Sequence, residues 1–177
     1  MSEYFYLASS LPELKTDQNV PISTSEFLET CGRLMKASDF QLLQSAKLSG
    51  FNEEPSENSL LAKWQAFEYG IRNELVRLRS KKLSLDPEPH LRRAFMNPQM
   101  AALAREIFEE PSPLQAEQRY IRSLWAVLEE LQACQSFNLE FLLIYYLKLQ
   151  LLERSDLIGF NTGKQQLESI IIGESHQ

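Results

Sequence analysis

The run NLEFLLIYYLKLQLLER, from Asn138 to Arg154, constrains the fold more than any other part of the chain. Leu, Ile and Tyr occupy nearly every face that a helix over these residues would present, so little of its circumference suits water. Such a helix either crosses a membrane or lies at the centre of a bundle. A crossing needs about 20 apolar residues without charge, and Glu140, Lys148 and Glu153 interrupt the run. The sequence therefore predicts a central bundle helix and no direct membrane insertion.

Amphipathic helical patterns cover most of the remaining sequence. We expect an all-α fold, a single helical bundle of about seven helices, because apolar residues recur at three- and four-residue spacings and Gly and Pro fall at helix ends. The helices are expected from Ser23, over 38–50, over 59–82, from Asn97-Pro98, over 112–134, over the central run, and after a turn at Gly159 to Gly163, with Thr162 as the cap of the last helix. Residues 3–14 suit a buried helical turn or a short extended segment equally.

Two helix starts carry a capping signal. Ser23 is followed by Glu26, the spacing of a capping box in which each side chain binds the other residue's backbone N–H. Ser38 and Gln41 repeat this spacing. The pattern predicts Ser23 and Ser38 as the residues that begin two successive helices.

The length of 177 residues fits one domain covering residues 1–177. Pro87 and Pro89 form a rigid break in the chain. A subdivision near residues 84–90 is therefore the alternative to a single bundle.

The sequence lacks the residue patterns that most enzymes and metalloproteins need. The histidines His90 and His176 and the cysteines Cys31 and Cys134 form no ligand-spaced cluster, and no Gly-x-Ser-x-Gly or phosphate-loop motif occurs. We therefore predict no catalytic residue, cofactor or metal. The net charge of −6 argues against nucleic acid as a partner.

The sequence also bears on the cellular compartment of the protein. The two cysteines are expected to stay reduced, and a disulfide between them is the less favoured alternative. The N-terminus lacks the basic and long apolar regions of a secretory signal. Together these features predict a cytoplasmic protein.

A basic cluster begins at Arg72, in the middle of the long helix expected over 59–82, and continues to Arg93. It holds 7 of the chain's 18 basic residues within 22 positions. It suits either a docking surface for an acidic partner or a solvated face in which Glu68 and Arg72 form an i,i+4 pair, and the solvated face is favoured because charge runs on helices are usually solvated. Tyr145 is a further candidate contact, since Tyr145 and Tyr146 cannot face the same way on a helix. The candidate partner-binding residues are Arg72, Arg77, Arg79, Lys82, Arg92, Arg93 and Tyr145.

Four segments in order carry a family resemblance: YFYLASSLPEL, PISTSEFLETC, WQAFEYGIRNELVRLRSKKL and LLIYYLKLQLLER. Together they resemble an uncharacterised bacterial family encoded with V-type (A/V-type) ATPase subunits. That family is distantly similar to the all-helical C (d) subunit of the V-type ATPase central stalk, although this chain is much shorter. The resemblance implies a non-enzymatic structural or assembly component on the cytoplasmic face of the membrane, with stalk or rotor subunits as partners.

Two other functions stay open from the sequence. One is a soluble helical enzyme or small-ligand binder without a recognisable motif, which a perturbed carboxylate lining a closed cavity would favour. The other is a free homodimeric adaptor with a self-complementary apolar patch.

Overall fold

The computed structural model describes residues 4–16, 20–48, 56–92, 98–133, 135 and 137–174, with 160–174 described by their backbone. Within these ranges the protein is all-helical and contains no strand, which confirms the predicted fold class. The first element is a helical turn and not an extended segment. The α-helices are α1 (Phe5–Ser10), α2 (Thr24–Leu34), α3 (Ala37–Ser45), α4 (Ser59–Leu83), α5 (Pro98–Phe108), α6 (Pro113–Gln132) and α7 (Leu139–Glu174).

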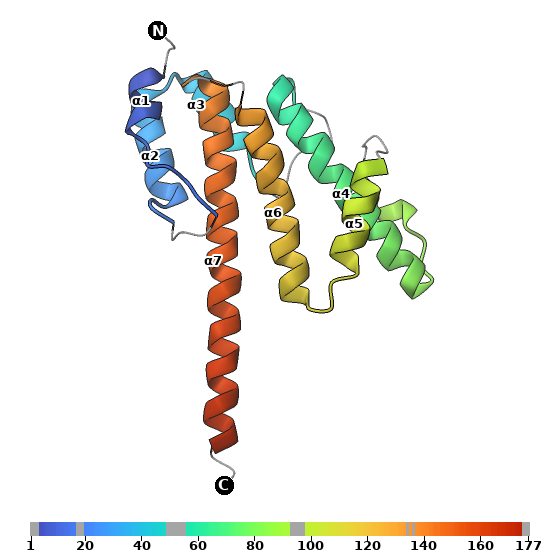
Figure 1. Ribbon diagram of the computed structural model, residues 1–177. Coiled ribbons are helices and arrows are strands. Elements are labelled where there is room, and N and C mark those ends of the chain that lie inside the picture. The colour runs from blue at the N-terminus through green and yellow to red at the C-terminus, as the bar shows by residue number, and fades with distance from the viewer. Residues whose placement is uncertain are drawn as a thin grey trace.

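Helix α7 forms the centre of the bundle, as the apolar run predicts. Every residue from Leu142 to Leu149 is buried. Figure 1 shows α1 and α2 on one side of α7, α3 behind its upper end, and α6 on the other side, with α4 and α5 beyond α6. Helices α2, α3 and α6 all contact α7, and α4 packs most extensively on α5. The central helix is therefore enclosed by both halves of the chain.

Lys148 lies inside this core, and only 6% of the residue is exposed. Its Nζ donates to Oε1 of Gln132 at 2.6 Å and lies 4.8 Å from the centre of the Trp125 ring. Burial lowers the pKa of Lys148, and the nearby Glu129 opposes that shift. The lysine that interrupts the apolar run thus links α7 to α6.

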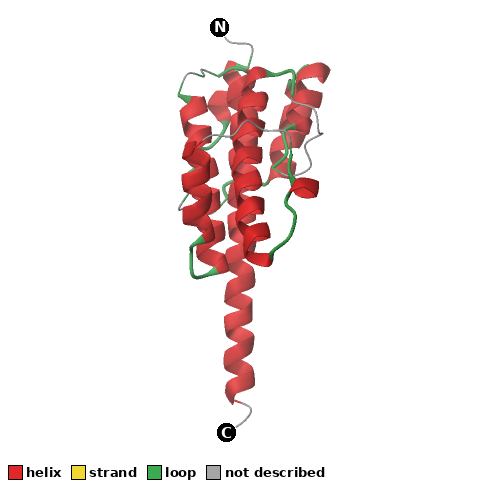
Figure 2. Ribbon diagram, turned by 90° about the vertical axis from the view of Figure 1, so that its right-hand side faces the viewer, coloured by secondary structure: helices red, strands yellow, loops and turns green. Residues whose placement is uncertain are grey.

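The predicted turn at Gly159 to Gly163 is wrong, because α7 continues through both glycines to Glu174. Glycine costs a helix interior about 1 kcal/mol relative to alanine, which weakens a helix without ending it. Thr162 consequently lies within a helix and does not cap one. Figure 2 shows the C-terminal part of α7 extending past the ends of the other helices. No helix in the described part of the chain combines the length and apolarity needed to cross a bilayer.

The two predicted capping signals have different outcomes. Ser23 caps α2 in a complete capping box, with the Glu26 N–H donating to Ser23 Oγ at 3.2 Å and the Ser23 N–H donating to Glu26 Oε2 at 2.8 Å. Ser38 is not a cap, because α3 begins one residue earlier and its N-cap, Lys36, makes no side-chain capping bond.

Helix α3 also ends at Ser45, before the predicted end at Gly50. Gln150 of α7 forms hydrogen bonds with the backbone groups that follow Ser45. Its Nε2 donates to the Ala46 carbonyl at 2.8 Å, and its Oε1 accepts from the Leu48 N–H at 3.2 Å. A side chain of the central helix therefore holds the chain in a non-helical path after α3.

The proline break reverses the chain between α4 and α5. Ser84 ends α4 in the left-handed conformation with φ of 56°, and a single 3₁₀ turn, η1 (Glu88–His90), follows. Leu91 is not helical, and Asn97 lies outside the described residues. Pro98 and Pro113 take the first positions of α5 and α6, close to the starts expected at Asn97-Pro98 and at residue 112.

The structure describes one of the two cysteines. Cys31 is a free, fully buried thiol. Burial raises its pKa to about 12. Cys134 lies outside the described residues.

Candidate anion-binding groove

A groove of about 570 Å³ lies where α4, α6 and α7 meet, beside η1. Four arginines reach it from three parts of the chain. Arg72 and Arg79 come from α4, Arg92 follows η1, and Arg154 comes from α7. The remaining lining is made by Asn73, Leu75, Val76, His90, Ile107, Pro113, Ala116, Glu117 and Tyr120.

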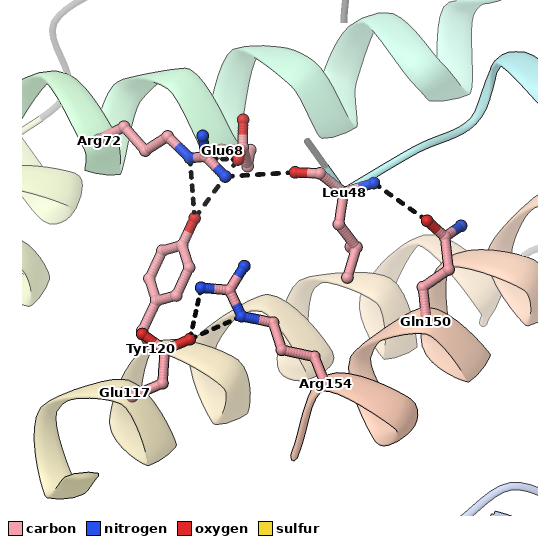
Figure 3. A network of polar contacts seen from close by, with 7 residues as sticks. All are labelled: Leu48, Glu68, Arg72, Glu117, Tyr120, Gln150 and Arg154. Carbon is pink, nitrogen blue, oxygen red and sulfur yellow. Dashed lines mark hydrogen bonds and ion pairs between the residues drawn. The ribbon is translucent and has the colours of Figure 1, made fainter. Parts of the chain in front are cut away.

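Arg72 is the most interior of these arginines. Its guanidinium forms an ion pair with Glu68, one helical turn earlier on α4, and donates to Tyr120 Oη at 3.3 Å. A further N–H donates to the Leu48 carbonyl at 3.2 Å. Figure 3 shows the resulting connection from α4 through Leu48 to Gln150 of α7. Arg72 therefore joins three segments and is held in place from several sides.

Glu68 is buried at 1% exposure behind the arginines. Tyr120 Oη donates to its Oε1 at 3.4 Å, and its Oε2 has no hydrogen-bond partner among the described residues. Burial raises the pKa of Glu68, while Arg72, Arg92, Arg154 and the Tyr120 hydroxyl act in the opposite direction. The carboxylate is thus a charge that the protein keeps out of water, stabilised mainly by arginines.

Arg154 is paired across the helix interface. Its Nε and one terminal nitrogen lie 2.7 Å and 2.6 Å from Oε1 of Glu117 on α6 (Figure 3). Its guanidinium also lies 5.9 Å from the centre of the Tyr120 ring. The pair fixes one wall of the groove.

Arg92 is positioned through its backbone. The Asn73 amide donates to the Arg92 carbonyl at 2.7 Å, and its Oδ1 accepts from the Arg92 N–H at 2.9 Å. Asn73 is only 4% exposed, so this clamp is rigid. The guanidinium then lies 5.0 Å from the centre of the Tyr69 ring. Arg92 is therefore presented to the groove without a carboxylate bound to it within the described residues.

Arg79 is exposed, and within the described ranges its guanidinium has no hydrogen bond or ion pair. Arg79 and Arg92 thus keep donors for an external group. With four guanidinium groups against the carboxylates of Glu68 and Glu117, the groove has two net positive charges. Arginine forks match carboxylate and phosphate oxygens, so the arrangement is suited to an anionic ligand.

The structure gathers three predicted residues, Arg72, Arg79 and Arg92, at this groove and places others elsewhere. Arg77 pairs with Glu74, and Lys82 lies 5.8 Å from the centre of the Phe108 ring. Arg93 lies outside the described residues.

Tyr145 is not a surface residue, which corrects its selection as a partner contact. It is 4% exposed, and its hydroxyl donates to the Pro12 carbonyl at 3.0 Å. The predicted i,i+4 pair of Glu68 and Arg72 is confirmed, but it is not solvated, because Glu68 is buried. Burial follows from the contact of α4 with α6, which no pattern within α4 reveals.

The sequence reasoning missed Arg154, Glu117 and Tyr120. They lie on helices distant in sequence from the basic cluster, and only the packing of α6 and α7 brings them to it. Among the described residues no group of three or more His, Cys, Asp or Glu side chains could hold a metal ion. No protein-family model, curated protein sequence or solved structure gives a significant match to the chain.

Proposed function

We propose that this protein is a non-enzymatic docking component that binds an acidic segment of a protein partner in the arginine groove. The observation that carries the proposal is the convergence of four arginines from three parts of the chain on one groove. Two of them, Arg79 and Arg92, have no carboxylate partner among the described residues. Bringing like charges together is unfavourable unless an anion compensates it, and a bound acidic segment supplies that anion.

The partner that we propose is a stalk or rotor subunit of a V-type ATPase. This part of the proposal rests on the four sequence segments that resemble the family encoded with such subunits. A central helix enclosed by two helical halves gives the rigid support that a docking surface requires. The protein would then act at the cytoplasmic face of the membrane through the ATPase.

A pull-down of the tagged native protein from its own membranes, read by mass spectrometry, tests the partner. We expect stalk or rotor subunits in near-stoichiometric amounts with the wild type. Arg79→Glu should lose them, since it reverses a groove charge that has no internal partner. Arg33→Glu is the matched control, because Arg33 is an exposed arginine on α2, away from the groove. Recovery of the protein alone would reject the ATPase proposal.

A direct measurement tests the groove separately from the partner's identity. Fluorescence anisotropy with a labelled, end-capped peptide containing adjacent glutamates should show binding that Arg79→Glu weakens at least about tenfold, the scale of one lost charge-assisted contact. The same peptide with glutamines should not bind. Equal binding of the two peptides would reject an anion-binding groove.

A small-molecule anion binder is the second candidate. The observation in its favour is the buried Glu68, whose raised pKa marks a perturbed carboxylate beside a pocket. Competition distinguishes the two: inorganic phosphate or a phosphorylated small molecule that displaces the peptide at micromolar concentration would favour the small ligand.

A further inference from the structure

We propose that Glu68 is the internal counter-ion of the arginine groove and that its charge sets the affinity of the groove for an acidic segment. The inference rests on the proposed function, since it concerns how the same groove is controlled. Glu68 does not contact the ligand in this scheme. It acts through its ion pair with Arg72 and through the negative electrostatic potential that its charge adds to the groove.

The first step is competition for Arg72. That guanidinium is already engaged by Glu68, Tyr120 and the Leu48 carbonyl. While Glu68 is ionised, the attraction of Arg72 for an external anion is largely cancelled. Arg79 and Arg92 then provide the attraction, and the net charge of the groove matches two carboxylates.

The second step concerns Glu68, whose carboxylate has one oxygen without a hydrogen bond in the described part of the chain. The side chain is 1% exposed, and Oε2 has no partner within the described residues. An ionised carboxylate in that position loses solvation that it does not fully regain. The cost is tolerated because arginines surround it. An anion that binds to those arginines removes part of this compensation.

The two charges are therefore linked through the same arginines. The groups facing Glu68 are Arg72 and Tyr69 on α4, Tyr120 on α6, Arg92 after η1 and Arg154 on α7. A bound anion raises the free energy of ionised Glu68 and so raises its pKa. By linkage, protonation of Glu68 must strengthen anion binding by the same factor.

This scheme makes a definite prediction about pH. Burial already raises the pKa of Glu68 above its ordinary value. As the pH falls through that raised pKa, the groove gains one positive charge and binds the acidic peptide more tightly. The gain ends where the peptide's own carboxylates take up protons.

Glu68→Gln is the test variant, because it keeps the side-chain shape while removing the charge. We expect it to bind the end-capped diglutamate peptide about tenfold more tightly at pH 7, the effect of one unit charge at close range. Its affinity should no longer rise with acidity. Glu106→Gln is the matched control: it makes the same charge change at an exposed residue that pairs with Arg119, outside the groove.

Titration calorimetry in two buffers of different ionisation enthalpy gives a second readout. Wild-type protein should take up a fraction of a proton when it binds the peptide, and Glu68→Gln should take up none. His90 also lines the groove, so His90→Gln is measured in parallel and should keep the proton uptake if Glu68 is its source. Thermal unfolding verifies that each variant is folded.

The outcomes separate the two proposals. If neither wild type nor Glu68→Gln binds the peptide, the docking function itself fails. If both bind with equal affinity and equal proton uptake, the proposal that the groove binds acidic segments is retained and the proposed role of Glu68 is rejected. Loss of proton uptake in His90→Gln alone would assign the pH dependence to His90 and also reject it.

Discussion

Glu153 of α7 holds the first residue of α2 through both of its carboxylate oxygens. Oε1 accepts from the backbone N–H of Thr24 at 2.6 Å, and Oε2 accepts from its hydroxyl at 2.9 Å, across 129 positions of sequence. The backbone N–H groups at a helix start lack partners within the helix, and negative charge is favourable there. The central helix therefore caps α2 from outside, in addition to Ser23.

Replacing Glu153 with alanine should destabilise the fold by about 1–2 kcal/mol, the usual cost of losing a helix cap. Urea unfolding followed by circular dichroism measures this. Asp156→Ala is the control, because Asp156 is an exposed acidic residue on the same helix. If Glu153→Ala unfolds at the same urea concentration as the control, the contact contributes no stability.

Gly70 allows α4 and α5 to approach closely. A Cβ atom at this position would lie far inside van der Waals contact with Sδ of Met100 on α5. Gly70→Ala should therefore cost about 1–3 kcal/mol by overpacking, in spite of alanine's better helix propensity. The double variant Gly70→Ala/Met100→Ala should regain part of that loss. Stabilisation by Gly70→Ala alone would mean that Met100 moves aside freely.

Cys31 should be unreactive until the protein unfolds. Its thiol is fully buried, and burial raises its pKa to about 12, so little reactive thiolate forms at neutral pH. In a Cys134→Ser background, labelling with a thiol reagent should follow global unfolding in urea. Complete labelling within seconds under native conditions would contradict the buried position.

Tyr145 should make the unfolding free energy fall at alkaline pH. Burial raises its pKa to about 12 in the folded protein, against about 10 in an unfolded chain. The folded state keeps a proton that the unfolded chain releases, so the stability from this group is complete below pH 10 and is lost towards pH 12.

The variant Tyr145→Phe measures this contribution. It should cost about 1 kcal/mol at pH 8, where the hydrogen bond to Pro12 is lost. Its stability should then fall less steeply than that of the wild type as the pH rises past 10. Parallel slopes for the two proteins would show that Tyr145 does not titrate differently on folding.

Asn73 should act as a positioning residue for Arg92. Asn73→Ala removes both hydrogen bonds to the Arg92 backbone and leaves every arginine in the chain. We expect weaker binding of the acidic peptide, with a smaller loss than Arg92→Ala causes, because the guanidinium is present but less ordered. Adding Asn73→Ala to Arg92→Ala should have no further effect on affinity. An additive loss would show that Asn73 acts by another route.

The sequence determined the helices that carry an uninterrupted local signal. The apolar run from Asn138, the capping box at Ser23 and the prolines at Pro98 and Pro113 each act within a few residues, so their effect can be read without the fold. Where a neighbouring element supplied the deciding contact, the prediction was wrong. Helix α3 ends at Ser45 because Gln150 binds the groups that follow.

The groove was also predictable from the sequence only in part. Its basic character was visible in the spacing of Arg72, Arg79 and Arg92, because all three follow within a short stretch of chain. Which of them face one site, and which are paired or covered, depended on tertiary packing. The burial of Glu68 and the arrival of Glu117, Tyr120 and Arg154 arise where α6 and α7 meet α4. A cluster of basic residues in the sequence therefore suggests an anionic partner, whereas desolvation and the distances between helices decide which of those residues line the groove.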